Sequence, residues 1–195
     1  MGAGGAEFDV RKRRDARGVG AETEAIVHPL PTAAMPDFRQ FQVSGLSPEP
    51  FAHLFSLSAD ELERLGARRV VADDAVGFPC RVSLEDVAAG EELVLLPYEH
   101  QPAPTSPYRA SGPIFVSRHA RASALAPGEL PPCVAGRLMS VRAYDAQHLI
   151  VSADVCEGAA LAPVIERMFA DAQVAYIHLH NAKRGCYSCR VDRLA

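Results

Sequence analysis

Short runs in which hydrophobic and polar residues alternate dominate the sequence after about residue 37. Alternation with a period of two predicts β-strands that bury one face. The runs lie at about 41–43, 68–72, 92–100, 114–117, 137–144, 149–155, 174–180 and 186–193. Because 145–148 is a short polar segment between two of these runs, it predicts a hairpin. The pattern therefore favours a mostly antiparallel sheet.

Two segments have the pattern of a helix instead. Ser58 followed three residues later by Glu61 is a capping box, and it predicts a short helix that stops at Gly66. In the segment of about 158–171, apolar residues recur every three or four positions, which predicts one long amphipathic helix. These elements together predict an α+β fold: a mostly antiparallel sheet with one long C-terminal helix (about 158–171) and short helices packed on it.

Residues 1–36 have no such periodicity, and they are rich in glycine and alanine with mixed charges. We interpret 1–36 as a disordered tail and 37–195 as a single α+β domain. The basic run 11–14 is offset by acidic neighbours, so a solvated tail is favoured over a nucleic-acid-binding arm. Because patterned sequence begins just after Met35, this residue is an alternative start of the protein.

Composition excludes several classes of protein. The chain of 195 residues carries 20 Lys and Arg against 24 Asp and Glu, a formal charge of −4, which gives no reason to expect nucleic acid as a partner. No apolar run approaches the roughly 18 residues that cross a bilayer, so no membrane partner is expected. The five cysteines have no framework spacing. A reduced, cytoplasmic protein is the simplest interpretation.

The C-terminal strands carry the most informative polar residues. In a strand over 174–180, Ile177 and Leu179 lie on the core face, whereas His178 and His180 lie on the other face. A five-residue turn over 181–185 would place Cys186 opposite His180 and on the face of both histidines. A turn that differed by one residue would send Cys186 to the opposite face.

Three interpretations of these residues stay open. Cys186 and His180 can form a thiolate–imidazolium pair, in which the thiolate is a nucleophile. His178, His180 and Cys186 can instead bind zinc or iron and leave one coordination position open, with His100 as a further ligand. The third interpretation is a polar strand face in water, with an ordinary half-buried cysteine.

Other polar residues lie at strand ends and turns, where functional groups concentrate. His100 ends the strand of 92–100 and can serve as a base or a metal ligand. In the turn, Lys183 and Arg184 can hold a carboxylate or a phosphate, and Gly185 supplies the positive φ that a longer turn requires. Cys80 is either reactive or, as is common for cysteine, part of the core.

Three segments together resemble a bacterial domain-of-unknown-function family, the one numbered twelve hundred and three. They are 77–84, 98–102 together with 108–111, and 178–187, and the resemblance extends from about Phe38 to Arg193. It implies no established activity, substrate or cofactor. It does imply that certain polar and cysteine residues belong to the family pattern, namely Cys80, His100, Arg109, His180 and Cys186.

The leading hypothesis is therefore a small enzyme with a Cys/His pocket that acts on a small anionic substrate. The candidate catalytic residues are Cys186, His180 and His100. The candidate substrate-binding residues are Arg109, Tyr108, Lys183, Arg184, Asn181, Cys80 and Arg81. One alternative is a zinc- or iron-binding domain that uses His178, His180 and Cys186, and another is a non-catalytic module that binds a small molecule or a peptide. No cofactor is required by the sequence.

Overall fold

The computed structural model describes residues 41–194, which belong to one compact unit. The expected disordered tail over 1–36 and the alternative start at Met35 lie outside the described residues. Within 41–194, no helix is both long enough and apolar enough to cross a membrane.

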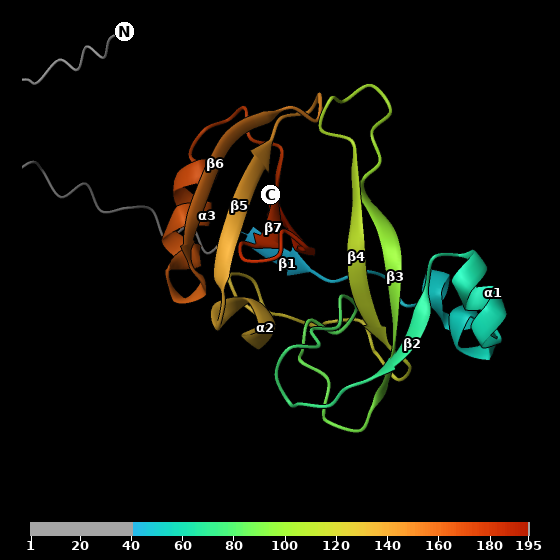
Figure 1. Ribbon diagram of the computed structural model, residues 1–195. Coiled ribbons are helices and arrows are strands. Elements are labelled where there is room, and N and C mark those ends of the chain that lie inside the picture. Colours follow the sequence, from blue (N-terminus) through green and yellow to red (C-terminus); the bar gives the residue numbers. More distant parts are fainter. Residues whose placement is uncertain (1–40, 195) are drawn as a thin grey trace, which may run out of the picture. The chain divides into compact units, whose positions relative to one another are not determined.

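Two antiparallel sheets make up most of the fold (Figure 1). The five-stranded sheet has the order β1-β8-β7-β5-β6, and the three-stranded sheet has the order β2-β3-β4. The strands of the first sheet are β1 (Phe41–Ser44), β5 (Leu138–Tyr144), β6 (Ile150–Glu157), β7 (Tyr176–Asn181) and β8 (Tyr187–Arg193). The strands of the second sheet are β2 (Arg68–Val71), β3 (Glu92–Gln101) and β4 (Ala110–Ser117).

The helices between these strands are all short. The 3-10 helices are η1 (Glu49–Ser56) and η2 (Gly158–Ala160), and the α-helices are α1 (Ala59–Arg64), α2 (Pro132–Ala135) and α3 (Leu161–Phe169). The predicted capping box is present at α1, because Ser58 Oγ accepts from the Glu61 N–H and the Glu61 carboxylate accepts from the Ser58 N–H. The predicted hairpin at 145–148 joins β5 to β6.

The prediction of an α+β fold with a long C-terminal helix over 158–171 is wrong. The helix α3 has only nine residues, and a single 3-10 turn, η2, precedes it. The Asp171 carboxylate accepts a hydrogen bond from the Gln173 N–H at 2.9 Å, and this local bond competes with continuation of the helix. The protein is mostly β-sheet, with short helices at the ends and sides of the two sheets.

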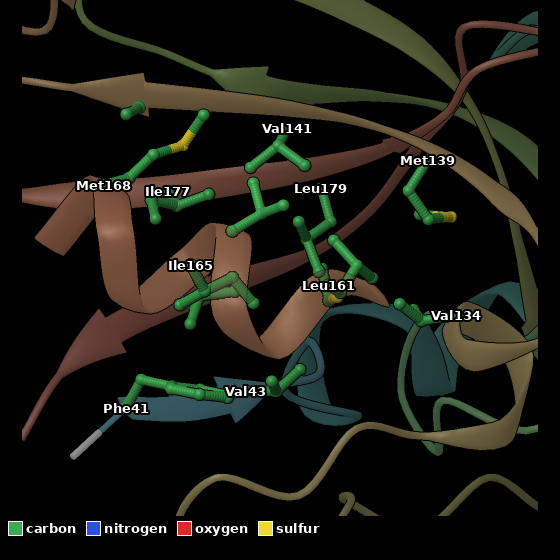
Figure 2. Close-up of a cluster of buried hydrophobic side chains, with 14 of the residues drawn as sticks. Phe41, Val43, Val134, Met139, Val141, Leu161, Ile165, Met168, Ile177 and Leu179 are labelled. Atoms are coloured by element: carbon green, nitrogen blue, oxygen red, sulfur yellow. The ribbon is translucent and has the colours of Figure 1, made fainter. Parts of the chain in front are cut away.

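The apolar stripe that α3 presents packs on one face of the five-stranded sheet. Leu161, Ile165 and Met168 of α3 meet Ile177 and Leu179 of β7 in one buried cluster (Figure 2). Burying an aliphatic side chain of this kind contributes about 1.5–3 kcal/mol, so this contact fixes β7 to α3. The three-stranded sheet has a buried cluster of its own, built around residues of η1, α1, β3 and β4.

Gly158 closes the end of β6 against α2, and a side chain there would not fit. An added Cβ would overlap the Val134 carbonyl oxygen and lie 2.6 Å from the carbonyl oxygen of Ala135. We expect Gly158→Ala to lower the free energy of unfolding by about 2 kcal/mol in urea denaturation, because backbone atoms must move. Gly136→Ala is the control, since its Cβ would meet no atom nearer than 3.6 Å. Equal stability of the two variants would contradict this prediction.

Candidate functional site

Three histidines from the two sheets come together in one place. His100 lies near the end of β3, and His178 and His180 lie on β7. Each offers one ligand nitrogen, and these nitrogens all lie within 4.8 Å of one another. The ring centroids of His100 and His180 are 4.9 Å apart, and those of His100 and His178 are 6.1 Å apart. We call these three residues the histidine group.

A break in strand pairing accompanies His100. Glu99 pairs with Ser111 and Gln101 pairs with Ala110, so His100 has no partner of its own on β4. Such a β-bulge bends the strand and re-aims a side chain. The bulge therefore accounts for a histidine of the three-stranded sheet that faces the histidines of β7.

The two histidines of β7 are placed by the period of two along a central strand. β7 is hydrogen-bonded to β5 on one side and to β8 on the other. Ile177 and Leu179 face α3, as the alternation predicts, and His178 and His180 lie on the opposite face. Both histidines are nonetheless buried, at 3% and 0% exposed, so this polar face does not meet water.

One nitrogen of each histidine is buried and has no hydrogen-bond partner among residues 41–194: Nδ1 of His100, Nδ1 of His178 and Nε2 of His180. Buried polar atoms in folded proteins are almost always bonded, so three such atoms in one group need an explanation. For His180 the tautomer follows from its neighbour. Its Nδ1 lies 3.1 Å from the Gly185 carbonyl oxygen, which can only accept, so Nδ1 carries the proton and Nε2 has a free lone pair.

Burial keeps these imidazoles uncharged. It lowers the pKa of His178 to about 3, and the positive charges of neighbouring groups, Arg190 and Arg142 among them, act in the same direction. Burial also lowers the pKa of His180 to about 3, although its bond to the Gly185 carbonyl opposes the shift. The pKa of His100 is lowered by burial and then by Arg142. A neutral imidazole is the form that binds a metal ion.

Tyrosine rings surround the histidine group and restrict its rotamers. Tyr187 stacks on His100 with parallel ring planes and a centroid separation of 5.3 Å. Tyr144 and Tyr176 lie 5.0 and 5.1 Å from the ring of His178. The hydroxyl of Tyr176 accepts from the Gln101 amide at 2.7 Å. An aromatic shell of this kind lowers the local dielectric and limits access of water.

The predicted contact between Cys186 and His180 is absent, because the turn is one residue shorter than expected. The Asn181 N–H donates to the Cys186 carbonyl at 2.9 Å, so only 182–185 form the turn, with Gly185 at φ +75° as expected. His180 consequently pairs with Tyr187 rather than with Cys186. Cys186 is on the other face of the hairpin, and its thiol lies 3.9 Å from the Arg184 carbonyl oxygen.

Several other predicted residues lie apart from the histidine group. Arg109 forms an exposed ion pair with Glu99 at 2.6 Å, and Tyr108 is exposed. Cys80 is fully buried in the core of the three-stranded sheet, where its sulfur accepts a weak hydrogen bond from the Ser117 N–H. Lys183 is at the exposed tip of the turn.

The remaining predicted residues line a second feature, which we call the arginine cavity. It has a volume of about 440 Å³, and its polar lining residues are Arg81, Arg137, Asn181, Arg184 and Cys186. A larger hollow of about 810 Å³ beside β2 contains none of the predicted site residues. The predicted site residues are therefore divided among the histidine group, the arginine cavity and the residues named above that belong to neither.

Sequence reasoning placed Tyr176 on the histidine face of its strand, but it missed Arg137 and the other two tyrosines of the shell, Tyr144 and Tyr187. Arg137 immediately precedes β5 and enters the cavity only because β5 lies beside β7 in the sheet. Tyr187 faces the histidines only because the turn has four residues. No local pattern in the sequence carries either piece of information.

Comparison with known proteins agrees with the resemblance noted in the sequence. A family model described as "Protein of unknown function (DUF1203)" matches residues 77–193, more than half of the chain. The match begins later than the expected start near Phe38. No curated protein and no solved structure matches the chain.

Lowering the pH should destabilise the metal-free protein. The histidines of β7 have a pKa of about 3 in the folded state, against about 6.5 when unfolded. Between pH 6.5 and pH 3 the unfolded chain takes up protons that the folded chain does not. The free energy of unfolding is therefore highest above pH 6.5, and it decreases as the pH falls. For His178 and His180 together, the loss from pH 7 to pH 5 is up to about 4 kcal/mol.

Urea denaturation of EDTA-treated protein at pH 7, 6 and 5 measures this loss. His178→Gln should make the dependence on pH shallower, because one titrating group is gone. His53→Gln, which changes an exposed histidine, should leave it unchanged. Stability that stays constant from pH 7 to pH 5 would be incompatible with neutral buried histidines.

Proposed function

Since the chain belongs to the DUF1203 family of proteins of unknown function, we propose a function from its site alone. The protein binds a divalent transition metal ion, Zn²⁺ or Fe²⁺, through His100, His178 and His180. Three protein ligands leave at least one coordination position for a further ligand, as in catalytic metal sites.

The observation that supports this proposal most strongly is the set of three buried imidazole nitrogens that make no hydrogen bond within the described residues. Each is buried without a hydrogen-bond partner, and the ligand atoms of the group lie within 4.8 Å of one another. An ion that binds imidazole nitrogen at about 2.0–2.1 Å holds two such ligands no more than about 4.2 Å apart. Ligand atoms at the limit of 4.8 Å must therefore approach one another by more than half an ångström, about 0.6 Å or more, when an ion binds.

The protonation states support the same conclusion. Metal ions compete with protons for imidazole nitrogen, and here burial lowers the pKa of His178 and His180 to about 3. The hydrogen bond from His180 Nδ1 to the Gly185 carbonyl leaves Nε2 as the ligand atom. Metal-binding histidines typically donate their other N–H to a carbonyl or carboxylate in this way. Neutral imidazole ligands suit zinc and iron.

The charges around the group favour an anion in the open position. Arg142 of β5 lies directly opposite His178 in the register, and its positive charge lowers the pKa of all three histidines. A guanidinium there repels the metal ion as well as a proton, and it attracts a negatively charged ligand, such as hydroxide or a carboxylate, whose charge would offset this repulsion. A small anionic molecule is therefore the proposed partner of the metal.

The proposal replaces the thiol–imidazole enzyme that the sequence favoured. Cys186 lies on the opposite face of the hairpin from His180, so His100 takes its place as the third ligand. The five cysteines of the chain are free thiols, which supports a reducing compartment such as the cytoplasm.

Metal content and affinity test this proposal. Untagged protein purified without chelator should contain about one equivalent of zinc or iron per chain by elemental analysis. After removal of the metal, calorimetric titration with Zn²⁺ should give a single site. His100→Gln and His180→Gln should each weaken binding by at least about a hundredfold, since loss of even an outer hydrogen-bond partner costs 10–100-fold.

Matched controls are His53→Gln and His119→Gln, which change exposed histidines and should bind Zn²⁺ like the native protein. Far-ultraviolet circular dichroism establishes that each variant is folded. A folded native protein that takes up no Zn²⁺ at micromolar concentration would refute the metal site. The same conclusion would follow if His100→Gln bound Zn²⁺ with unchanged affinity.

A further inference from the structure

Among residues 41–194, no Asp or Glu lines the arginine cavity, and we infer that the cavity binds a small organic anion, in which a carboxylate or phosphate group is attached to an apolar body. The residues that would hold the anionic group are Arg81, Arg184 and Asn181. This site is separate from the histidine group, and its argument does not rest on the proposed metal.

Arg81 is a buried cation without a counter-charge. Its side chain is 4% exposed. Its Nε donates to the Tyr187 carbonyl at 2.6 Å and its Nη1 donates to the Pro79 carbonyl, and both of these acceptors are neutral. No acidic residue within 41–194 forms an ion pair with it, and burial lowers its pKa. A buried cation that lacks a partner is strongly unfavourable, so a bound anion would stabilise this arrangement.

The other arginines of the cavity differ in their partners. Arg137 is neutralised by Asp86, whose two carboxylate oxygens accept from Arg137 Nη2 at 2.6 and 2.8 Å. Arg184 is exposed, and no acidic residue of the described chain pairs with it. The residues that line the cavity include no Asp or Glu. Within the part of the chain that the structure describes, two guanidinium groups at one small cavity therefore have no acidic partner.

Hydrogen bonds within the turn order the backbone that carries Asn181 and Arg184. The Gly185 N–H donates to the Asn181 carbonyl at 2.7 Å, and the Asn181 side chain accepts from the Lys183 N–H at 3.1 Å. These bonds order the backbone from which the exposed Arg184 side chain extends, and Arg184 and the buried Arg81 both line the cavity. Guanidinium groups recognise carboxylate and phosphate through paired, charge-assisted hydrogen bonds.

The remaining lining residues indicate what the anionic group is attached to. Leu95, Pro113 and Phe115 of the three-stranded sheet supply an apolar wall. A volume of about 440 Å³ is within the range of small-molecule sites and exceeds what one phosphate or carboxylate group would fill. The expected ligand is therefore a small amphipathic anion rather than a bare inorganic ion.

Cys186 provides a reporter, because its partly exposed thiol lines the same cavity. The full chain is treated with iodoacetamide at constant ionic strength, with and without phenyl phosphate or benzoate, and alkylation is followed by mass spectrometry. A saturating anion should slow alkylation of Cys186 at least about fivefold, as expected when a ligand covers the thiol. Alkylation of Cys156, which lies on β6 outside the cavity, should be unchanged.

Control experiments distinguish protection that requires the negative charge of the ligand from protection by its shape alone or by the proposed metal ion. Benzamide, the neutral analogue of benzoate, should not protect Cys186. Arg184→Gln should raise the half-protecting concentration roughly tenfold through loss of a charge-assisted bond. Arg167→Gln removes an exposed arginine paired with Asp154, outside the cavity, and should have no effect. The experiment is done on native and EDTA-treated protein, so failure of the metal proposal leaves its result interpretable.

Whichever of benzoate and phenyl phosphate protects at the lower concentration identifies the preferred anionic group. The inference is overturned if neither anion protects Cys186 at about 20 mM, well above a millimolar dissociation constant. It is also overturned if benzamide protects as well as benzoate, or if Arg184→Gln leaves protection unchanged.

Discussion

The constraint on which the rest of the structure depends is that β7 is buried on both faces. Its apolar face packs on α3 through Ile177 and Leu179. That packing fixes the orientation of the strand, and the period of two then directs His178 and His180 toward the three-stranded sheet. The histidines cannot reach water without disrupting a hydrophobic core. Their low pKa is thus a consequence of how the opposite face of the same strand packs.

Irregularities of the backbone then decide which side chains meet the histidines. The bulge at His100 adds a third imidazole from the other sheet. The four-residue turn over 182–185, with a further irregularity between Leu179 and His180, brings Tyr187 to the histidine face and leaves Cys186 on the other. In a strand, a shift of one residue turns each side chain to the opposite face. Such a shift in β8 would exchange Tyr187 and Cys186, and one in β3 would turn His100 away from β7.

Features that depend on local alternation could be predicted from the sequence, whereas features that depend on turn length or on the pairing of distant strands could not. The split of β7 into an apolar and a histidine face was predictable, because alternation is local. The apolar stripe of α3 was predictable too, but its end was not, since the Asp171 side chain intervenes. The face of Cys186 depended on one residue of turn length. Arg81, Asn181 and Arg184 were candidate binding residues of the sequence, but Arg137 joins them in one cavity only through the pairing of distant strands, of which the sequence gives no local sign.

Burial has opposite electrical consequences at the two sites, although Tyr187 belongs to both: its ring stacks on His100 and its carbonyl accepts from Arg81. An imidazole titrates near neutral pH, so burial removes its charge and leaves a lone pair suited to a cation. A guanidinium titrates so far above neutral pH that burial lowers its pKa without removing its charge. The same dehydrated interior therefore produces a neutral group that can accept a metal ion and, beside it, a positively charged cavity that can accept an anion.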